Sequence, residues 1–191
     1  DAAEPDRAQR EESRGDLSVL RLNPLTRHAI FMNKPRVLQR IIETLEIDLD
    51  VAIRAAQTAY ETATHEENIA ENKYDTLGLE ASYLAAGHAR RVEEIRQSLM
   101  EYRNLTLKPF DELRGIQSGD LIVLESASGV ARQLFLGPDA AGLKVSVDEG
   151  LVTVITARAP LGQTLLGKFD GDEVEIVVNG SRQSFEIVQV V

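Results

Sequence analysis

The feature that most constrains the fold is a pair of apolar heptad patterns that flank an acidic stretch. In the first pattern, apolar side chains recur at alternating steps of four and three residues, at Leu38, Ile42, Leu45, Leu49, Ala52, Ala56, Ala59 and Ala63. This spacing places all of them on one stripe of an α-helix. Because one helix cannot bury such a stripe by itself, the pattern predicts a second helix packed along the first.

The second pattern follows the acidic stretch and predicts that partner helix. It consists of Tyr74, Leu77, Ala81, Leu84, His88, Val92, Ile95, Leu99 and Tyr102. Steps of four on both sides of His88 predict a stutter in the repeat. Pro35 suits the first turn of one helix, and Pro109 closes the other. We therefore expect an antiparallel hairpin over residues 32–108, with helices about 45 Å long if each has about 30 residues.

The acidic stretch then lies at the tip of the hairpin. Residues 61–80 contain one basic residue, Lys73, and the carboxylates Glu61, Glu66, Glu67, Glu71, Asp75 and Glu80. Basic residues gather toward the opposite end, at Lys34, Arg36, Arg40, Arg90, Arg91, Arg96 and Arg103. The sequence thus predicts a rod with a negative tip and a more basic base, a distribution that would orient its approach to a partner.

Residues 109–191 change to the pattern of a small β domain. Short segments rich in Val and Ile, such as DLIVLES and SFEIVQVV, are separated by Gly, Asp, Asn and Pro. Asn179 and Gly180 are typical of a tight hairpin between two strands. The pattern predicts about six mostly antiparallel strands, with a short helix at PLGQTLLGK. We therefore predict an α+β fold, in which an antiparallel coiled-coil helical hairpin precedes an antiparallel β domain.

Composition excludes several classes of function. The formal net charge of −10 disfavours a broad nucleic-acid-binding surface, which needs a basic patch. The absence of cysteine excludes disulfides, thiol catalysis and thiolate zinc sites. No apolar run approaches the length of a membrane span or of a signal peptide's apolar region, so we expect a cytoplasmic protein without a membrane partner.

Residues 1–31 show no sustained period and mix acidic with basic side chains. We expect a mobile polar tail there. Met32 directly precedes the first patterned segment, and a translation start at Met32 is the alternative interpretation of this tail.

Two motifs resemble the Gre-type (GreA/GreB) family of bacterial transcript-cleavage factors over residues 34–191. The C-terminal motif matches at Pro160, Leu161, Gly162, Leu165, Leu166, Gly167, Lys168, Gly171, Asp172 and Val174. The tip motif matches at Asn68, Glu71, Asn72 and Tyr74. The resemblance implies a coiled-coil hairpin followed by an FKBP-like β domain that docks at the rim of the secondary channel of RNA polymerase.

The same resemblance implies that the factor assists a reaction that the polymerase performs. The hairpin inserts its tip into the channel and stimulates the polymerase's own cleavage of backtracked RNA, so the factor is not itself an enzyme. The tip carboxylates Glu66, Glu67, Glu71 and Asp75 would share a Mg²⁺ ion with the polymerase, and no cofactor would be bound by the free protein. Polymerase docking would involve Arg158, Ala159, Pro160, Leu161 and Gly162. We expect a monomer.

Two positions depart from the family pattern. Asn68 stands where the family has Asp, and a neutral amide is a poorer Mg²⁺ ligand than a carboxylate. Arg158 and Ala159 stand where the family usually has an acidic or amide residue followed by Ser. The alternative function is therefore a Gre-like regulator that occupies the channel without stimulating cleavage.

Other interpretations remain open from the residues alone. Asn68 and Glu71 have the spacing of a helix N-cap and its capping-box partner. An FKBP-like fold also suggests a prolyl isomerase, but the aromatic residues of the β region are Phe110, Phe135, Phe169 and Phe185, without Tyr or Trp. A coiled-coil adaptor that pairs with another helix is the third class, and a monomer in solution would contradict it.

Overall fold

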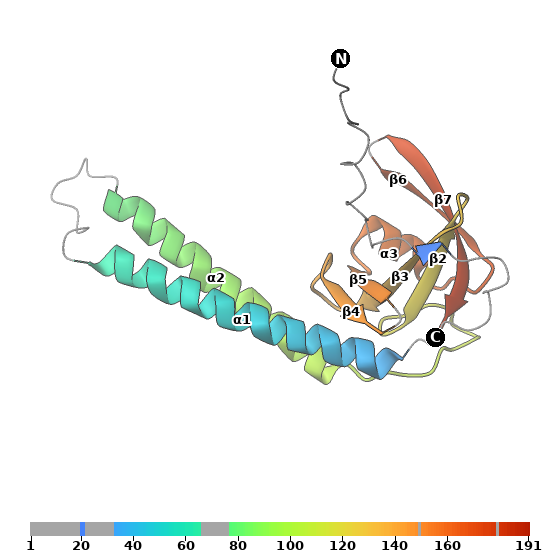
Figure 1. The fold of residues 1–191 in the computed structure, drawn as a ribbon, viewed down its shortest axis with the longest axis horizontal. Coiled ribbons are helices and arrows are strands. Elements are labelled where there is room, and N and C mark those ends of the chain that lie inside the picture. Colours follow the sequence, from blue (N-terminus) through green and yellow to red (C-terminus); the bar gives the residue numbers. More distant parts are fainter. Residues whose placement is uncertain (1–19, 22–32, 66–76, 149, 179) are drawn as a thin grey trace, which may run out of the picture.

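The computed structural model describes residues 20–21, 33–65, 77–148, 150–178 and 180–191. Two long helices, α1 (Lys34–Thr64) and α2 (Leu77–Asn104), lie side by side and extend away from a β-sheet that packs against their base (Figure 1). Asn33 caps α1 by accepting a 3.0 Å hydrogen bond from the backbone N–H of Arg36. Pro35 lies in the first turn of α1, as predicted from its fixed φ angle.

The described helices bury most of the predicted stripe, but Val37 and Ile41, which the pattern left out, are more deeply buried than the predicted Leu38 and Ile42. All eight predicted positions of α1 are buried or half-buried. The side chains of Tyr74 and Leu77 lie outside the described residues.

In α2, Leu84 is 63% exposed, whereas Ala85 is half-buried. Apart from Ser98 and Glu101, the buried and half-buried positions in the described part of α2 follow one unbroken heptad pattern through residues 78, 81, 85, 88, 92, 95, 99 and 102. The predicted stutter is wrong, because it assigned the stripe to the large apolar Leu84 rather than to the small Ala85.

The sheet has the strand order β4-β5-β3-β2-β7-β6. Its strands are β2 (Leu121–Ser126), β3 (Val130–Gly137), β4 (Lys144–Val147), β5 (Gly150–Thr156), β6 (Glu173–Val178) and β7 (Ser181–Val190). A short strand, β1 (Leu20–Arg21), pairs antiparallel with Ala131 and Val130 of β3. The short helix predicted after β5 is confirmed as α3 (Pro160–Leu165). The predicted α+β class, a helical hairpin followed by a β domain, is confirmed.

The sheet is mixed rather than wholly antiparallel, because β3 and β5 pair in parallel. After β3 the chain forms the edge strand β4 and then returns as β5 between β4 and β3. Val152, Val154 and Ile155 of β5 are buried, whereas Lys144 and Ser146 of β4 are exposed. The more apolar strand therefore takes the inner position, and the short polar strand takes the edge.

Strands β6 and β7 form the predicted hairpin. They pair antiparallel up to Val178 and Ser181, which lie on either side of the predicted two-residue turn. Gly180 of that turn has a φ of 78°, a conformation that glycine adopts readily. Asn179 lies outside the described residues.

Both faces of the sheet are covered by apolar side chains. On one face, the hairpin and the sheet share a core of Val37, Ile41, Leu45, Ile95, Leu99, Tyr102, Leu121, Phe135, Val145, Val152 and Val154. On the other face, α3 contributes to a second core around Ile122, Leu124, Leu134, Leu136 and Leu165. Because the first core contains side chains of both helices and of four strands, burial of apolar surface holds the hairpin base on the sheet. The proposed domain boundary at residues 108 and 109 stays a prediction.

Candidate functional site

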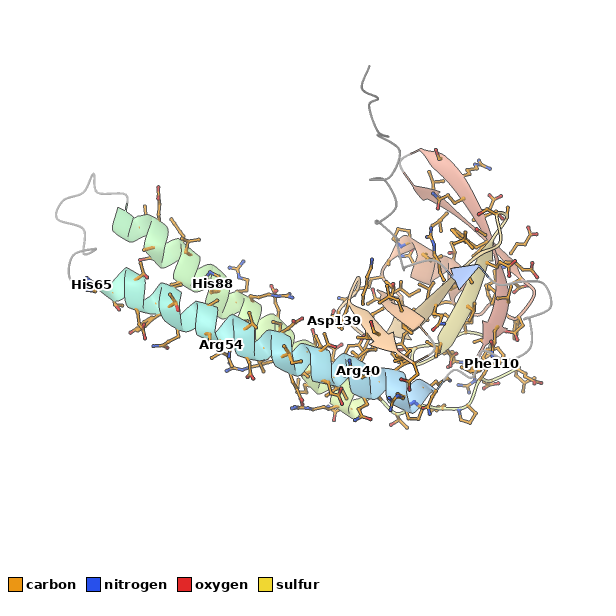
Figure 2. All side chains as sticks on the ribbon, in the orientation of Figure 1. Arg40, Arg54, His65, His88, Phe110 and Asp139 are labelled. Carbon is orange, nitrogen blue, oxygen red and sulfur yellow. The ribbon has the colours of Figure 1, made fainter. Side chains whose placement is uncertain are left out.

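The predicted tip residues lie outside the part of the chain that the structure describes. They are Glu66, Glu67, Glu71 and Asp75, with Asn68 as the proposed partner of Glu71 in a capping box. α1 ends at Thr64 and α2 begins at Leu77, both at the end of the hairpin away from the sheet, where Figure 2 labels His65. The metal and capping roles of the tip therefore stay predictions.

Within the described residues, no group of three or more His, Cys, Asp or Glu side chains is arranged to hold a metal ion. Among the helices of this part of the chain, none combines the length and the hydropathy that a membrane crossing needs. The predicted shared Mg²⁺ stays a prediction.

The five predicted docking residues lie together at the turn from β5 into α3. Ala159 has an extended backbone and donates its N–H to the carbonyl oxygen of Thr156 at 3.0 Å. Pro160 then starts α3, where the missing N–H of proline leaves no hydrogen bond unmade. Arg158 and Pro160 are exposed, and the half-buried Leu161 packs against the second core. The turn therefore presents a cation and a proline ring on a buried base, and its docking role stays a prediction.

Gly162 fixes the approach of α3 to the end of β5. A Cβ atom at this position would lie 2.0 Å from the carbonyl oxygen of Thr156 and 3.3 Å from the Cα of Ala157. Both neighbouring atoms belong to the backbone, so neither can rotate away. Glycine is therefore required for residues 158–162, here called the docking turn, to adopt this shape. This role of Gly162 is structural.

Asp139 joins the docking turn to the hairpin, and the sequence analysis missed it. Arg158 Nη2 donates to Asp139 Oδ1 at 3.1 Å, and Ser98 Oγ of α2 donates to Asp139 Oδ2 at 2.7 Å. Figure 2 shows Asp139 where the hairpin meets the sheet. These partners lie 19 and 41 residues away along the chain, so no local pattern marks Asp139.

Tyr102 completes this junction from inside the core. Its hydroxyl donates to the backbone carbonyl oxygen of Asp139 at 2.7 Å, and the side chain is fully buried. Burial raises the pKa of the Tyr102 hydroxyl, and the negative charge of Asp139 raises it further. Gly137 makes room for the hydroxyl, because a Cβ at residue 137 would lie 2.0 Å from it. Tyr102 is therefore a neutral hydrogen-bond donor at the foot of α2.

A buried ion pair fixes the start of α1. Lys34 Nζ lies 2.7 Å from Asp120 Oδ1 and donates to the carbonyl oxygen of Lys108 at 2.7 Å. The second oxygen of Asp120 accepts the backbone N–H of Gln117 at 2.8 Å. Because both charges are paired and hydrogen-bonded, this pair belongs to the structure of the base and is not a free cation for a partner.

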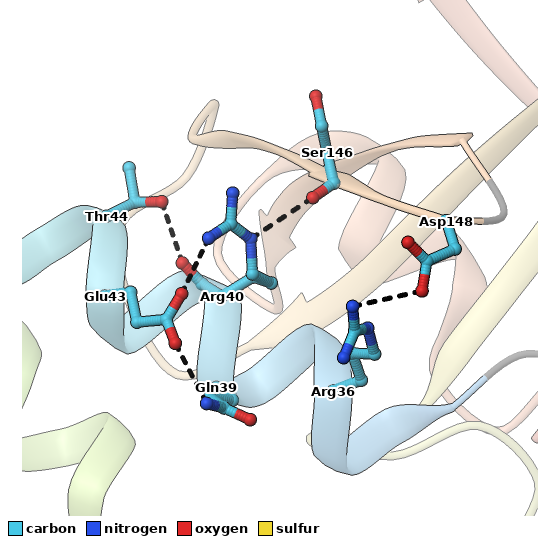
Figure 3. Close-up of polar contacts among 7 residues, drawn as sticks. All are labelled: Arg36, Gln39, Arg40, Glu43, Thr44, Ser146 and Asp148. Atoms are coloured by element: carbon cyan, nitrogen blue, oxygen red, sulfur yellow. Dashed lines mark hydrogen bonds and ion pairs between the residues drawn. The ribbon is translucent and has the colours of Figure 1, made fainter.

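Arg36 and Arg40 also contact the sheet (Figure 3). Arg36 Nη2 lies 3.0 Å from a carboxylate oxygen of Asp148, and Arg40 Nε donates to the carbonyl oxygen of Ser146 at 3.3 Å. Arg40 also donates to Glu43 at 2.7 Å, and this hydrogen bond lowers the pKa of the Glu43 carboxyl. Part of the positive charge predicted to orient the rod therefore holds α1 against β4.

The chain is similar to curated transcription elongation factors. It is 30% identical over 159 residues to transcription elongation factor GreA of Nitratidesulfovibrio vulgaris (strain DSM 19637 / Miyazaki F), covering 80% of this chain and 88% of that protein. It is 25% identical over 164 residues to GreA of Syntrophus aciditrophicus (strain SB), covering 83% and 96%. No family model matches the chain.

The chain is also similar to solved structures that are more distant in sequence. The GreA factor homolog 1 (Gfh1) protein of Thermus thermophilus is 19% identical, with a TM-score of 0.34, and the match covers 78% of this chain and 94% of that chain. Gfh1 of Thermus aquaticus is 21% identical, with a TM-score of 0.33 and coverage of 82% and 93%.

Proposed function

Because the chain belongs to the Gre family of bacterial transcription elongation factors, we propose that it inserts its hairpin into the secondary channel of RNA polymerase and stimulates cleavage of backtracked RNA. The observation that carries this proposal is a long hairpin whose base is buried on the sheet. α1 has 31 residues. At about 1.5 Å per residue it is about 46 Å long, which suits delivery of a tip to a distant site.

The chemistry proposed for the tip fits its donor atoms. Mg²⁺ prefers oxygen ligands, and Glu66, Glu67, Glu71 and Asp75 offer carboxylates. A bound Mg²⁺ would supply charge stabilisation at the reacting phosphate. The tip lends ligands to an ion held jointly with the polymerase, and the active site of the polymerase performs the cleavage. The protein is then a regulator and not itself an enzyme.

Docking is proposed at the turn from β5 into α3. Arg158 and Pro160 are exposed there, while Leu161 and Gly162 anchor the turn on the sheet. The factor acts as a monomer, because each helix buries its apolar stripe against the other within one chain. It works in the cytoplasm, where bacterial polymerase transcribes.

One observation favours a second candidate function. Asn68 stands where the family pattern has Asp, and its amide cannot offset the charge of Mg²⁺. The second candidate is a factor that binds in the channel and alters transcription without stimulating cleavage.

A cleavage assay separates the two candidates. Backtracked elongation complexes with 3′-labelled RNA receive the unaltered protein or a Glu67→Gln, Glu71→Gln double variant. The matched control is Glu61→Gln, Glu80→Gln, which removes the same charge from exposed helical positions beside the predicted tip set. The proposed function predicts short labelled products with the unaltered protein and the control, but not with the tip variant.

The other outcomes are equally informative. Polymerase binding without release of labelled products would support the second candidate. Equal cleavage by all three proteins would refute the metal role of the tip. Absence of polymerase binding would refute both candidates.

A further inference from the structure

Asp139 is the residue through which the hairpin and the docking turn share one set of hydrogen bonds. Lys34 and Arg36 also tie the hairpin to the sheet, but their partners Asp120 and Asp148 contact no docking residue in the described interactions. Asp139 alone among these carboxylates contacts both α2 and the docking turn, through Ser98 and Arg158.

The two carboxylate oxygens of Asp139 serve different elements. Oδ2 accepts the hydroxyl of Ser98, which is buried on α2, and Oδ1 accepts the guanidinium of Arg158, whose side chain is 77% exposed. Hydrogen bonds to a charged carboxylate are stronger and shorter than neutral ones. Contacts at both oxygens restrict the rotation of the carboxylate, so they couple the position of α2 to that of the docking turn.

The backbone around Asp139 is held as firmly as its side chain. Its carbonyl oxygen accepts the hydroxyl of the buried Tyr102. The next residue, Ala140, has a φ of 57°, which is uncommon for a residue with a side chain. Such conformations persist where the surrounding structure determines them. The turn that carries Asp139 is therefore a fixed point against which the hairpin is oriented.

Small rotations at this point produce large displacements at the tip. From Ser98 to the start of α2 at Leu77, the helix rises about 32 Å at about 1.5 Å per residue. Each degree of rotation about Ser98 therefore moves that end by about 0.5 Å. Misplacement of a reacting group by about 1 Å costs up to about 100-fold in rate. An error of a few degrees at the base is enough to misplace a tip carboxylate.

We propose that Asp139 is a positioning residue that sets the direction of the hairpin relative to the docking turn. When the docking turn binds polymerase, the direction of the hairpin tip is then fixed as well. This inference rests on the proposed function for its consequence in transcription. Its structural part, the fixed hairpin direction, is a property of the free protein.

The experiment uses Asp139→Asn and Ser98→Ala in the full chain. Asparagine removes the negative charge and keeps one acceptor oxygen, so it can accept from Arg158 or from Ser98 but not from both. Ser98→Ala removes the contact from the hairpin side and leaves the docking turn unaltered. The control is Glu46→Gln, which removes a 2.6 Å ion pair with Arg103 inside the hairpin, and Glu46 has no polar contact with Asp139 or the sheet among the described interactions.

The first readout is the direction of the hairpin. Because the chain has no cysteine, spin labels are placed at two introduced cysteines, one at the exposed Arg54 of the hairpin and one at the exposed Ala127 of the turn between β2 and β3. We expect the distance distribution between the labels to broaden in Asp139→Asn and Ser98→Ala but not in Glu46→Gln. An unchanged distribution in both test variants overturns the proposal.

The second readout separates the direction of the hairpin from the affinity for polymerase. At saturating protein, we expect the effect on transcription to fall by about tenfold or more in both test variants, since a misplacement of about 1 Å costs up to about 100-fold. The concentration for half-maximal polymerase binding should change by less than about threefold in Ser98→Ala, since its docking turn is intact, whereas loss of stability alone would shift this concentration.

A full effect at saturation despite a broadened distribution overturns the positioning role in transcription. If the unaltered protein does not bind polymerase, the proposed function fails, and the label distances in the free protein still decide whether Asp139 sets the hairpin direction.

Discussion

Replacement of Tyr102 by Phe removes a single oxygen atom and tests the contact between α2 and the turn that carries Asp139. The ring of Tyr102 is part of the core that the hairpin and the sheet share, and phenylalanine preserves it. The substitution removes the hydroxyl that donates to the carbonyl oxygen of Asp139 at 2.7 Å. The carbonyl is left without that donor, next to a small void over Gly137.

The expected loss follows from this buried hydrogen bond. Removing one partner of a buried neutral pair costs about 1–2 kcal/mol of unfolding free energy. For a chain of this size, each kcal/mol lowers the melting temperature by about 2–4 °C. Urea denaturation followed by circular dichroism at neutral pH measures the loss. Tyr83→Phe is the matched control, because Tyr83 is 70% exposed, and it should change stability by less than about 0.5 kcal/mol.

The pH dependence adds a second signature. Folding raises the pKa of Tyr102 above its ordinary value of 10.0, so the folded protein retains a proton that the unfolded chain loses above about pH 10. The contribution of Tyr102 is complete below pH 10 and is lost as the pH rises beyond it. The stability difference between the unaltered protein and Tyr102→Phe should therefore shrink above pH 10. Equal stability at neutral pH, or a difference that stays constant from about pH 8 to pH 11, would refute the reasoning.

Three further substitutions test the core, the docking turn and the buried ion pair. Leu45→Ala should lose about 2–5 kcal/mol in urea denaturation because Leu45 is buried between hairpin and sheet, whereas Leu84→Ala should lose less than about 0.5; equal losses would contradict the corrected stripe. Gly162→Ala should cost about 1–3 kcal/mol and speed amide hydrogen exchange in α3, and unchanged exchange would contradict the steric argument. Lys34→Met should cost about 3–5 kcal/mol, since it leaves the Asp120 carboxylate buried without its cation, and a loss below about 1 kcal/mol would show that water replaces the lysine.

Features with a local period could be predicted from the sequence. The stripe of α1 repeats every 3.5 residues on average, and Pro35 marks the first helical turn, so the helix could be recognised without its partner. The turn between β6 and β7 and the short helix α3 also depend on neighbouring residues. The family resemblance came from such contiguous motifs, which is why it covers the docking residues.

Choices between similar side chains depended on packing. Leu84 and Ala85 are adjacent, and hydrophobicity favours the leucine, yet the leucine is exposed and the alanine is half-buried. A small side chain lets the two helices approach closely, and this gain appears only when both helices are present. The parallel pairing of β3 with β5 likewise depends on which strand fills the inner position of the sheet, a comparison between strands rather than a property of either one.

By itself, the sequence determined the hairpin and the strands, and it predicted an acidic tip separate from a docking motif, because each arises from residues close together in the chain. Only the tertiary structure decided where the hairpin points. The core shared by hairpin and sheet holds the hairpin base, and Asp139 adds contacts with Arg158, Tyr102 and Ser98, which lie 19, 37 and 41 residues away. The sequence around a carboxylate in a turn does not identify such partners, because the contacts form only after the sheet has brought α2 and the docking turn together.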